Sequence, residues 1–193
     1  EGSLLLTLEE IGRLVSHSGD PAETLNNVVT LIQRRFGTDV CSIYLLETDR
    51  AHLVLAATVG LRADSVGRIR MSITEGLAGL VAEQLKPQLV ADAAAHPRFK
   101  FFPDAGEDVY RSFLGVPLID RGLLQGVLVV QTSDARTFAA DDVRLLSMAG
   151  AQVAATVTEA RTAGHFVAPA YQRLVALSQN LWWSWDDETT ALF

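Results

Sequence analysis

Two long apolar runs follow each other in the second half of the chain, at residues 112–119 and 123–131, with a polar connector at 120–122. Runs this continuously apolar are typical of strands covered on both faces, because a strand with one wet face alternates apolar and polar residues. The short connector predicts an antiparallel hairpin. Gly115 and Gly126 lie inside the runs and indicate bulges or the close approach of another backbone.

Apolar residues recur at three- and four-residue spacing in residues 4–15, 25–36 and 143–160, which predicts three amphipathic helices. Asp20 is placed to cap the second helix, and Gly37 is suited to end it. The spacing in the last stretch is heptad-like, which is the pattern of a helix that pairs with a second copy.

Shorter elements separate these helices from the central hairpin. Residues 40–47 and 52–59 are dense in β-branched and aromatic residues, which predicts a second hairpin, and a short helix over 77–85 and a short strand over 88–91 follow. Residues 92–110 contain two prolines, a glycine and four aromatic residues. A loop of this kind beside a sheet is either a lid or a packed plug. The order of elements is that of an α+β domain with an antiparallel sheet.

Five stretches carry a family resemblance: EGLAGLVAE at 75–83, DAAAHPRF at 92–99, SFLGVPLI at 112–119, QGVLVVQ at 125–131 and the segment from Phe138 to Leu146. In this order and spacing they resemble a GAF domain, and within that family the GAF module of the nitrogen-type phosphotransferase enzyme I. The resemblance implies an α+β fold, a GAF-like central antiparallel sheet with helices on both faces, and a sensory or regulatory role for residues 1–163.

The tail carries a second resemblance, above all in Asn-Leu-Trp-Trp-Ser-Trp at 180–185. Residues 171–193 are similar to the opening of bacterial α-glucan (glycogen) phosphorylases, and 164–170 form the expected linker. Together the two resemblances imply a GAF domain fused ahead of a glucan phosphorylase and cut from a longer protein. Pyridoxal phosphate is then expected only in the parent enzyme. The alternatives are the sensory GAF front of a nitrogen-type phosphotransferase enzyme I and a purely structural dimerisation module.

Composition removes several classes of function. Sixteen Lys and Arg against 23 Asp and Glu give a net charge of −7, which argues against nucleic-acid binding. No apolar run is long enough to span a membrane. The single cysteine, Cys41, fits the reducing cytoplasm and is interpreted as a buried small apolar residue. The four histidines are scattered, so we expect no metal site and no catalytic residue in this chain.

A ligand pocket is expected between the sheet and residues 75–110, where GAF domains hold ligands. The candidate lining residues are Ser42, Tyr44, His96, Arg98, Phe99, Tyr110, Arg111 and Ser112. For Tyr44 and Phe99 a place in the core is an equal alternative. Arg98 and Arg111 either meet an anionic effector or are exposed. His96 is interpreted first as a residue that fixes its loop.

The ligand itself stays open at this point. The Asn-Lys, Phe, Asp-Glu signature of cyclic-nucleotide GAF domains falls on Gln131-Thr132, Phe138 and Asp142-Val143, and three of the five positions differ. A different small-molecule effector is therefore the expected partner. The other expected partners are the catalytic domain of the parent protein and a second copy of the chain, bound through helices 4–17 and 140–161.

Overall fold

The computed structural model describes residues 2–17, 20–103 and 110–164. They form a six-stranded sheet in the order β3-β2-β1-β6-β5-β4, in which every neighbouring pair is antiparallel. The strands are β1 (Val40–Leu46), β2 (His52–Val59), β3 (Arg70–Ser72), β4 (Gln88–Val90), β5 (Ser112–Asp120) and β6 (Leu123–Thr132). The predicted α+β fold with a central antiparallel sheet is therefore confirmed.

The hairpin of β5 and β6 lies inside the sheet, as its apolar runs predict. Its turn consists of Arg121 and Gly122, which have φ angles of 50° and 77°. Two successive positive φ angles give the turn a twist that matches the twist of the strands. Gly126 lies where β6 meets β1, and a Cβ there would overlap the carbonyl oxygen of Tyr44. The expected close approach of another backbone is confirmed at this position.

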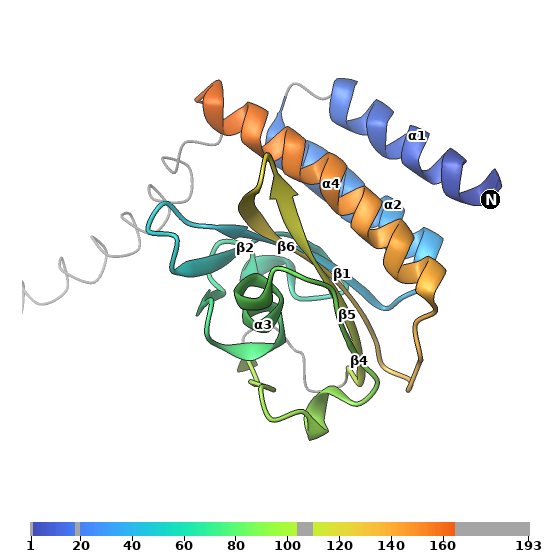
Figure 1. Cartoon of the computed structure of the whole chain (residues 1–193), viewed down its shortest axis with the longest axis vertical. Helices are drawn as coiled ribbons and strands as arrows, with labels where there is room; N and C mark the ends of the chain where they lie inside the picture. The colour runs from blue at the N-terminus through green and yellow to red at the C-terminus, as the bar shows by residue number, and fades with distance from the viewer. Residues whose placement is uncertain (1, 18–19, 104–109, 165–193) are drawn as a thin grey trace, which may run out of the picture.

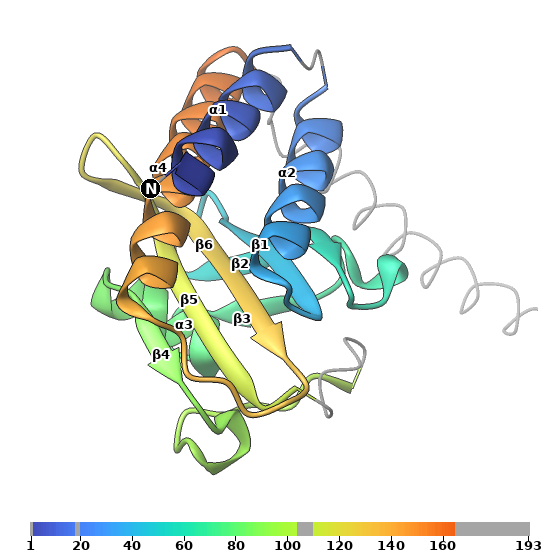
Figure 2. The ribbon, with the colours of Figure 1, turned by 90° about the vertical axis from the view of Figure 1, so that its right-hand side faces the viewer.

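Three helices cover one face of the sheet. Helices α2 (Pro21–Phe36) and α4 (Ala140–Thr162) pack on the strands, and α1 (Gly2–His17) contacts both of them from the outside (Figures 1 and 2). The Asp20 carboxylate accepts a hydrogen bond from the amide of Ala22, and Gly37 ends α2 in the left-handed conformation. The predicted start and stop of α2 are confirmed.

The opposite face is covered by one short helix and by loops. Helix α3 (Gly76–Gln84) packs on β5 and β6, and residues 60–69 and 92–103 run beside it (Figure 1). A second apolar cluster separates this layer from the sheet. The irregular stretch predicted for 92–110 contains a short 3-10 helix at Ala93–Ala95, and its residues 104–109 lie outside the described part of the chain.

The apolar stripe of α4 is used inside the chain. Leu146, Gly150, Val153 and Val157 are buried, and they face the strands of their own sheet rather than solvent. Ile11 of α1 is also fully buried in the same cluster. The pattern that motivated the expected dimer therefore has a partner within one copy, and dimerisation stays a prediction.

Two further expectations concern the rest of the chain. The expected linker at 164–170, of which only Gly164 is described, and the phosphorylase-like segment at 171–193 lie outside the described residues. Within the described part of the chain, no helix combines the length and apolar character needed to cross a membrane.

Candidate functional site

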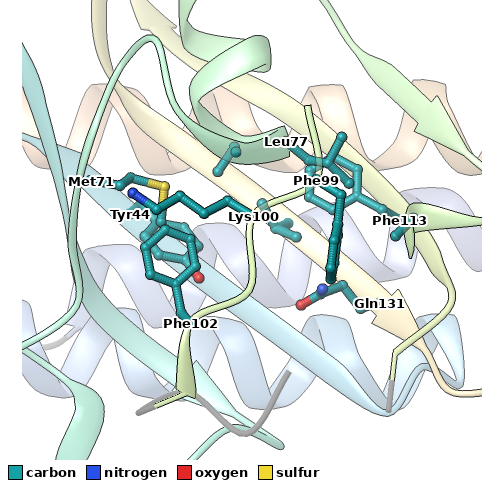
Figure 3. Close-up of a pocket in the computed structure, with 12 residues that line it drawn as sticks. Tyr44, Met71, Leu77, Phe99, Lys100, Phe102, Phe113 and Gln131 are labelled. Atoms are coloured by element: carbon teal, nitrogen blue, oxygen red, sulfur yellow. The ribbon is translucent and has the colours of Figure 1, made fainter. Parts of the chain in front are cut away.

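A pocket lies between the sheet and the layer formed by α3 and the following loop (Figure 3). Its walls are Tyr44, Met71, Gly76, Leu77, Ala78, Ala93, Phe99, Lys100, Phe102, Phe113, Val129 and Gln131. The cavity volume is about 30 Å³, which is room for only a few water molecules. The predicted position of the pocket is therefore occupied mainly by the side chains that surround it.

Tyr44 reaches the pocket because side chains alternate along β1. Cys41 and Ile43 belong to the cluster under the helices, whereas Val40 and Tyr44 belong to the cluster under α3. Tyr44 is only 2% exposed, so it is both a core residue and part of the pocket wall. Its role in binding a ligand stays a prediction.

Gln131 is the buried polar residue of the pocket. It lies on β6 beside Phe113 of β5 and is 8% exposed. Its main chain accepts a hydrogen bond from Asp39, but its side-chain amide has no hydrogen-bond partner among the described residues. Most buried polar groups in proteins have a partner, so this amide is available to a molecule in the pocket.

The loop over the pocket is anchored to α3 by two ion pairs. Nη1 of Arg98 lies 2.7 Å from a carboxylate oxygen of Glu83, and Nζ of Lys100 lies 2.8 Å from a carboxylate oxygen of Glu75. Lys100 also lies 5.4 Å from the centre of the Phe102 ring. The hydrogen bond and charge of Lys100 hold the pKa of Glu75 below its usual value, so Glu75 is ionised at neutral pH.

His96 has the structural role that its first interpretation assigned to it. Its Nδ1 accepts a hydrogen bond from the amide of Arg98 at 3.1 Å, and its own amide donates to the carbonyl of Ala93. Of the predicted residues in this loop, Phe99 lines the pocket, while Arg98 and His96 lie beside it.

The other four predicted residues lie outside the pocket wall. Ser42 shares a hydrogen bond with Thr58 at 2.8 Å, and the hydroxyl of Tyr110 donates to the carbonyl of Gly60 at 3.0 Å. Ser112 is fully buried and ties β5 to the carbonyls of Ala91 and Asp134. Arg111 is exposed, and its guanidinium lies 3.8 Å from Asp92. These residues position the strands and loops around the site.

Several wall residues were not among the predicted ones: Met71, Lys100, Phe102, Phe113, Val129 and Gln131. From the sequence, Gln131 stood out only as a departure from a signature. A stronger signal for it was available, because a glutamine near the end of an otherwise apolar run is a polar residue in a buried strand. Met71 and Phe113 carried no such signal, since apolar residues in strands are ordinary.

The single cysteine is unsuited to nucleophilic chemistry. Cys41 is fully buried under the helices, on the face of the sheet opposite the pocket. Burial alone raises the pKa of its thiol far above the ordinary value, which keeps the thiol protonated. The interpretation of Cys41 as a small apolar core residue is confirmed.

A second group of polar side chains gathers at the turn between β1 and β2. Ligand atoms of Glu47, Asp49 and His52 lie within 4.8 Å of one another. Arg70 lies between the two carboxylates, with Nε 2.7 Å from Glu47 and Nη2 3.1 Å from Asp49. Amide and side-chain hydrogen bonds from Ala51 and His52 lower the pKa of Asp49. Arg70 supplies the positive charge that a metal ion would bring, so the group is best explained as a structural ion-pair network.

Comparisons with known proteins agree with this geometry. The chain is 36% identical over 174 residues to the phosphoenolpyruvate-dependent phosphotransferase system protein of Escherichia coli (strain K12), and the match covers 90% of the chain and 23% of that protein. It is 29% identical over 164 residues to the Nif-specific regulatory protein of Azospirillum brasilense, covering 82% of the chain and 26% of that protein. The chain thus spans about a quarter of the length of the curated relatives it matches.

A solved structure is also similar to this chain. The GAF domain from a phosphoenolpyruvate-protein phosphotransferase of Coxiella burnetii superposes with a TM-score of 0.79 at 34% identity, covering 84% of this chain and 96% of that one. Nothing in these comparisons supports a glucan phosphorylase parent. The family model of the GAF domain matches residues 18–158, and the chain therefore belongs to the GAF domain family.

Proposed function

We propose that this chain is a regulatory module that binds a small molecule in the pocket between the sheet and α3. The observation that carries the proposal is the amide of Gln131, which is 8% exposed, lines the pocket and has no partner among the described residues. The amide atoms of Gln131 are not among the fully buried, unpaired side-chain atoms of the described residues, so they reach solvent in the empty pocket. A ligand that hydrogen-bonds with this amide takes the place of that water.

The pocket wall indicates the chemistry of the ligand. Tyr44, Phe102 and Phe113 provide an apolar, aromatic surface, and Gln131 offers one donor and one acceptor side. The fitting molecule is small, with an apolar or planar part and a group that pairs with an amide.

The relatives in the phosphotransferase group suggest the setting of this module. We place it at the sensory front of a phosphotransferase of the nitrogen type, because two proteins of that description match most of the chain at 34–36% identity. The motif at 180–185 favours a second candidate, the front of a glucan phosphorylase. The residues that follow Phe193 in the parent protein decide between the two: a phosphohistidine domain supports the first, and a pyridoxal phosphate domain supports the second.

Thermal unfolding with a panel of amino acids, nucleotides and sugar phosphates tests the binding function. A ligand present at about 100 times its Kd stabilises the protein by about 2.7 kcal/mol, which corresponds to a Tm increase of about 5–10 °C for a chain of this size. In Gln131→Met we expect an unchanged or higher Tm without ligand and the loss of most of the ligand-induced increase.

Gln125→Met is the matched control. Gln125 lies on the same strand and is 6% exposed, but its amide oxygen accepts a hydrogen bond from Arg161 at 2.7 Å and it lies outside the pocket. This variant should lower the Tm and keep the ligand-induced increase. If every compound of the panel leaves the wild-type Tm unchanged, or shifts it equally in Gln131→Met, the binding function is wrong.

A further inference from the structure

Residues 96–103, called the lid here, cover the pocket with side chains of their own. Phe99, Lys100 and Phe102 form part of its wall, and Figure 3 shows the two rings and the lysine lying across it. With these side chains in place, the remaining space holds only a few water molecules. Any larger ligand therefore needs the lid to move.

Two contacts hold the lid to opposite ends of α3. Glu75 precedes the first residue of the helix and pairs with Lys100, and Glu83 lies in the last turn and pairs with Arg98. The four side chains are between 30% and 45% exposed. Ion pairs with this exposure are weak and are screened by salt, so each one is easily broken.

The side chain of Arg98 also destabilises the closed position of the lid. Its Nε and Nη2 are buried and have no hydrogen-bond partner in the described part of the chain, and only Nη1 reaches Glu83. Guanidinium nitrogens that lose water without gaining a partner destabilise the state in which this happens. When the lid lifts, water reaches both nitrogens, so the opening restores hydrogen bonds that the closed state lacks.

We infer that the lid has two states of similar free energy: a closed state held by the pairs of Glu83 with Arg98 and of Glu75 with Lys100, and an open state favoured by hydration of Arg98. The inference rests on the proposed function only for the identity of the ligand. The lid regulates access to the pocket, and ionic strength shifts the balance between its two states.

Hydrogen–deuterium exchange of the lid amides, which the lid has at every residue except Pro97 and Pro103, tests the inference in the ligand-free 193-residue chain. Glu83→Gln should speed this exchange about two- to fivefold, which is the range expected for loss of one exposed ion pair. Arg98→Met should leave it unchanged or slow it, because methionine keeps the apolar packing and removes the unpaired nitrogens. Of the two partners of this ion pair, only the glutamate is therefore expected to speed lid exchange when it is replaced.

Glu9→Gln is the control, since it removes an exposed ion pair with Arg13 on α1 and should leave the lid unchanged. Raising NaCl from 0.05 to 1 M should speed lid exchange in the wild type and have no further effect in the double variant Glu75→Gln/Glu83→Gln.

Equal acceleration by Glu83→Gln and Arg98→Met, or no acceleration by Glu83→Gln, would overturn the inference. Because this measurement uses no ligand, it can succeed even if the panel of compounds finds no binder. The experiments can therefore refute the two-state lid and the proposed binding function independently of each other.

Discussion

Two glutamines on β6 differ in their proposed roles because only one of them has a side-chain hydrogen-bond partner among the described residues. Gln125 and Gln131 are 6% and 8% exposed, and they lie six residues apart on one strand. Gln125 bonds with Arg161, and Gln131 faces the pocket without a partner among the described residues. The first therefore contributes to the fold, and the second is the residue on which the proposed binding function depends.

A close backbone contact gives the sharpest prediction at this scale. Gly126→Ala should lower the free energy of unfolding by about 1–3 kcal/mol, because the new methyl group would overlap the backbone of Tyr44 and push β6 away from β1. Denaturant unfolding measures this. Gly12→Ala is the control: a Cβ at this position would have no atom within 4 Å, and alanine favours a helix, so stability should rise by up to about 1 kcal/mol.

At the scale of elements, helices α2 and α3 both end in a residue with a left-handed backbone, but only one of these residues is a glycine. Gly37 ends α2 with a φ of 58°, whereas Leu85 ends α3 with a φ of 53° although leucine is disfavoured there. Leu85 is also 52% exposed, so packing compensates for little of this strain. Helix α3 ends here because the chain must turn into β4, which the tertiary structure requires.

The two helix ends should respond in opposite ways to substitution. Leu85→Gly is expected to raise the free energy of unfolding by about 0.5–1 kcal/mol, and Gly37→Ala to lower it by about 1–2 kcal/mol. Chemical denaturation of both variants beside the wild type measures the difference. A loss of stability in Leu85→Gly would mean that the contacts of the leucine side chain outweigh its backbone strain.

At the scale of the whole molecule, the sheet separates two apolar clusters with different roles. The cluster beneath α2 and α4 contains the fully buried Leu146, Val153 and Val157 and forms a closed core. The cluster beneath α3 includes partly exposed loop residues such as Phe99 and Phe102, and it contains the pocket. Both clusters contain fully buried residues that stabilise the fold, and the pocket of the proposed binding function lies on the α3 face alone.

This division predicts how a substitution in α4 affects folding and assembly. Leu146→Ala should lower the free energy of unfolding by about 2–5 kcal/mol, because the side chain is fully buried within one copy. Leu123→Ala, at a position that is 58% exposed, should change it by less than about 0.5 kcal/mol. Sedimentation velocity should give the same species for both variants and the wild type. A smaller species for a still stable Leu146→Ala would show that Leu146 lies between two copies.

The sequence by itself determined the class of the fold and most of its elements, but not the short strand β3. Apolar runs, helical spacing and the signals at Asp20 and Gly37 depend on local chemistry, and the hairpins follow from short polar connectors between apolar runs. These features need no knowledge of distant contacts, because each residue's preference is expressed within its own element. The approximate place of the pocket also followed, through the family resemblance.

Only the tertiary structure decided which side chains meet in the pocket. Met71, Phe113 and Gln131 come from three strands, and they line one pocket only because of the strand order and register. The alternation of side chains along a single strand predicts neither of these. Conversely, Ser42, Tyr110 and Ser112 had suitable chemistry but are bonded to neighbouring groups outside the wall. Whether a buried polar group is satisfied is a property of its neighbours in space, and for Gln131 that property carries the proposed function.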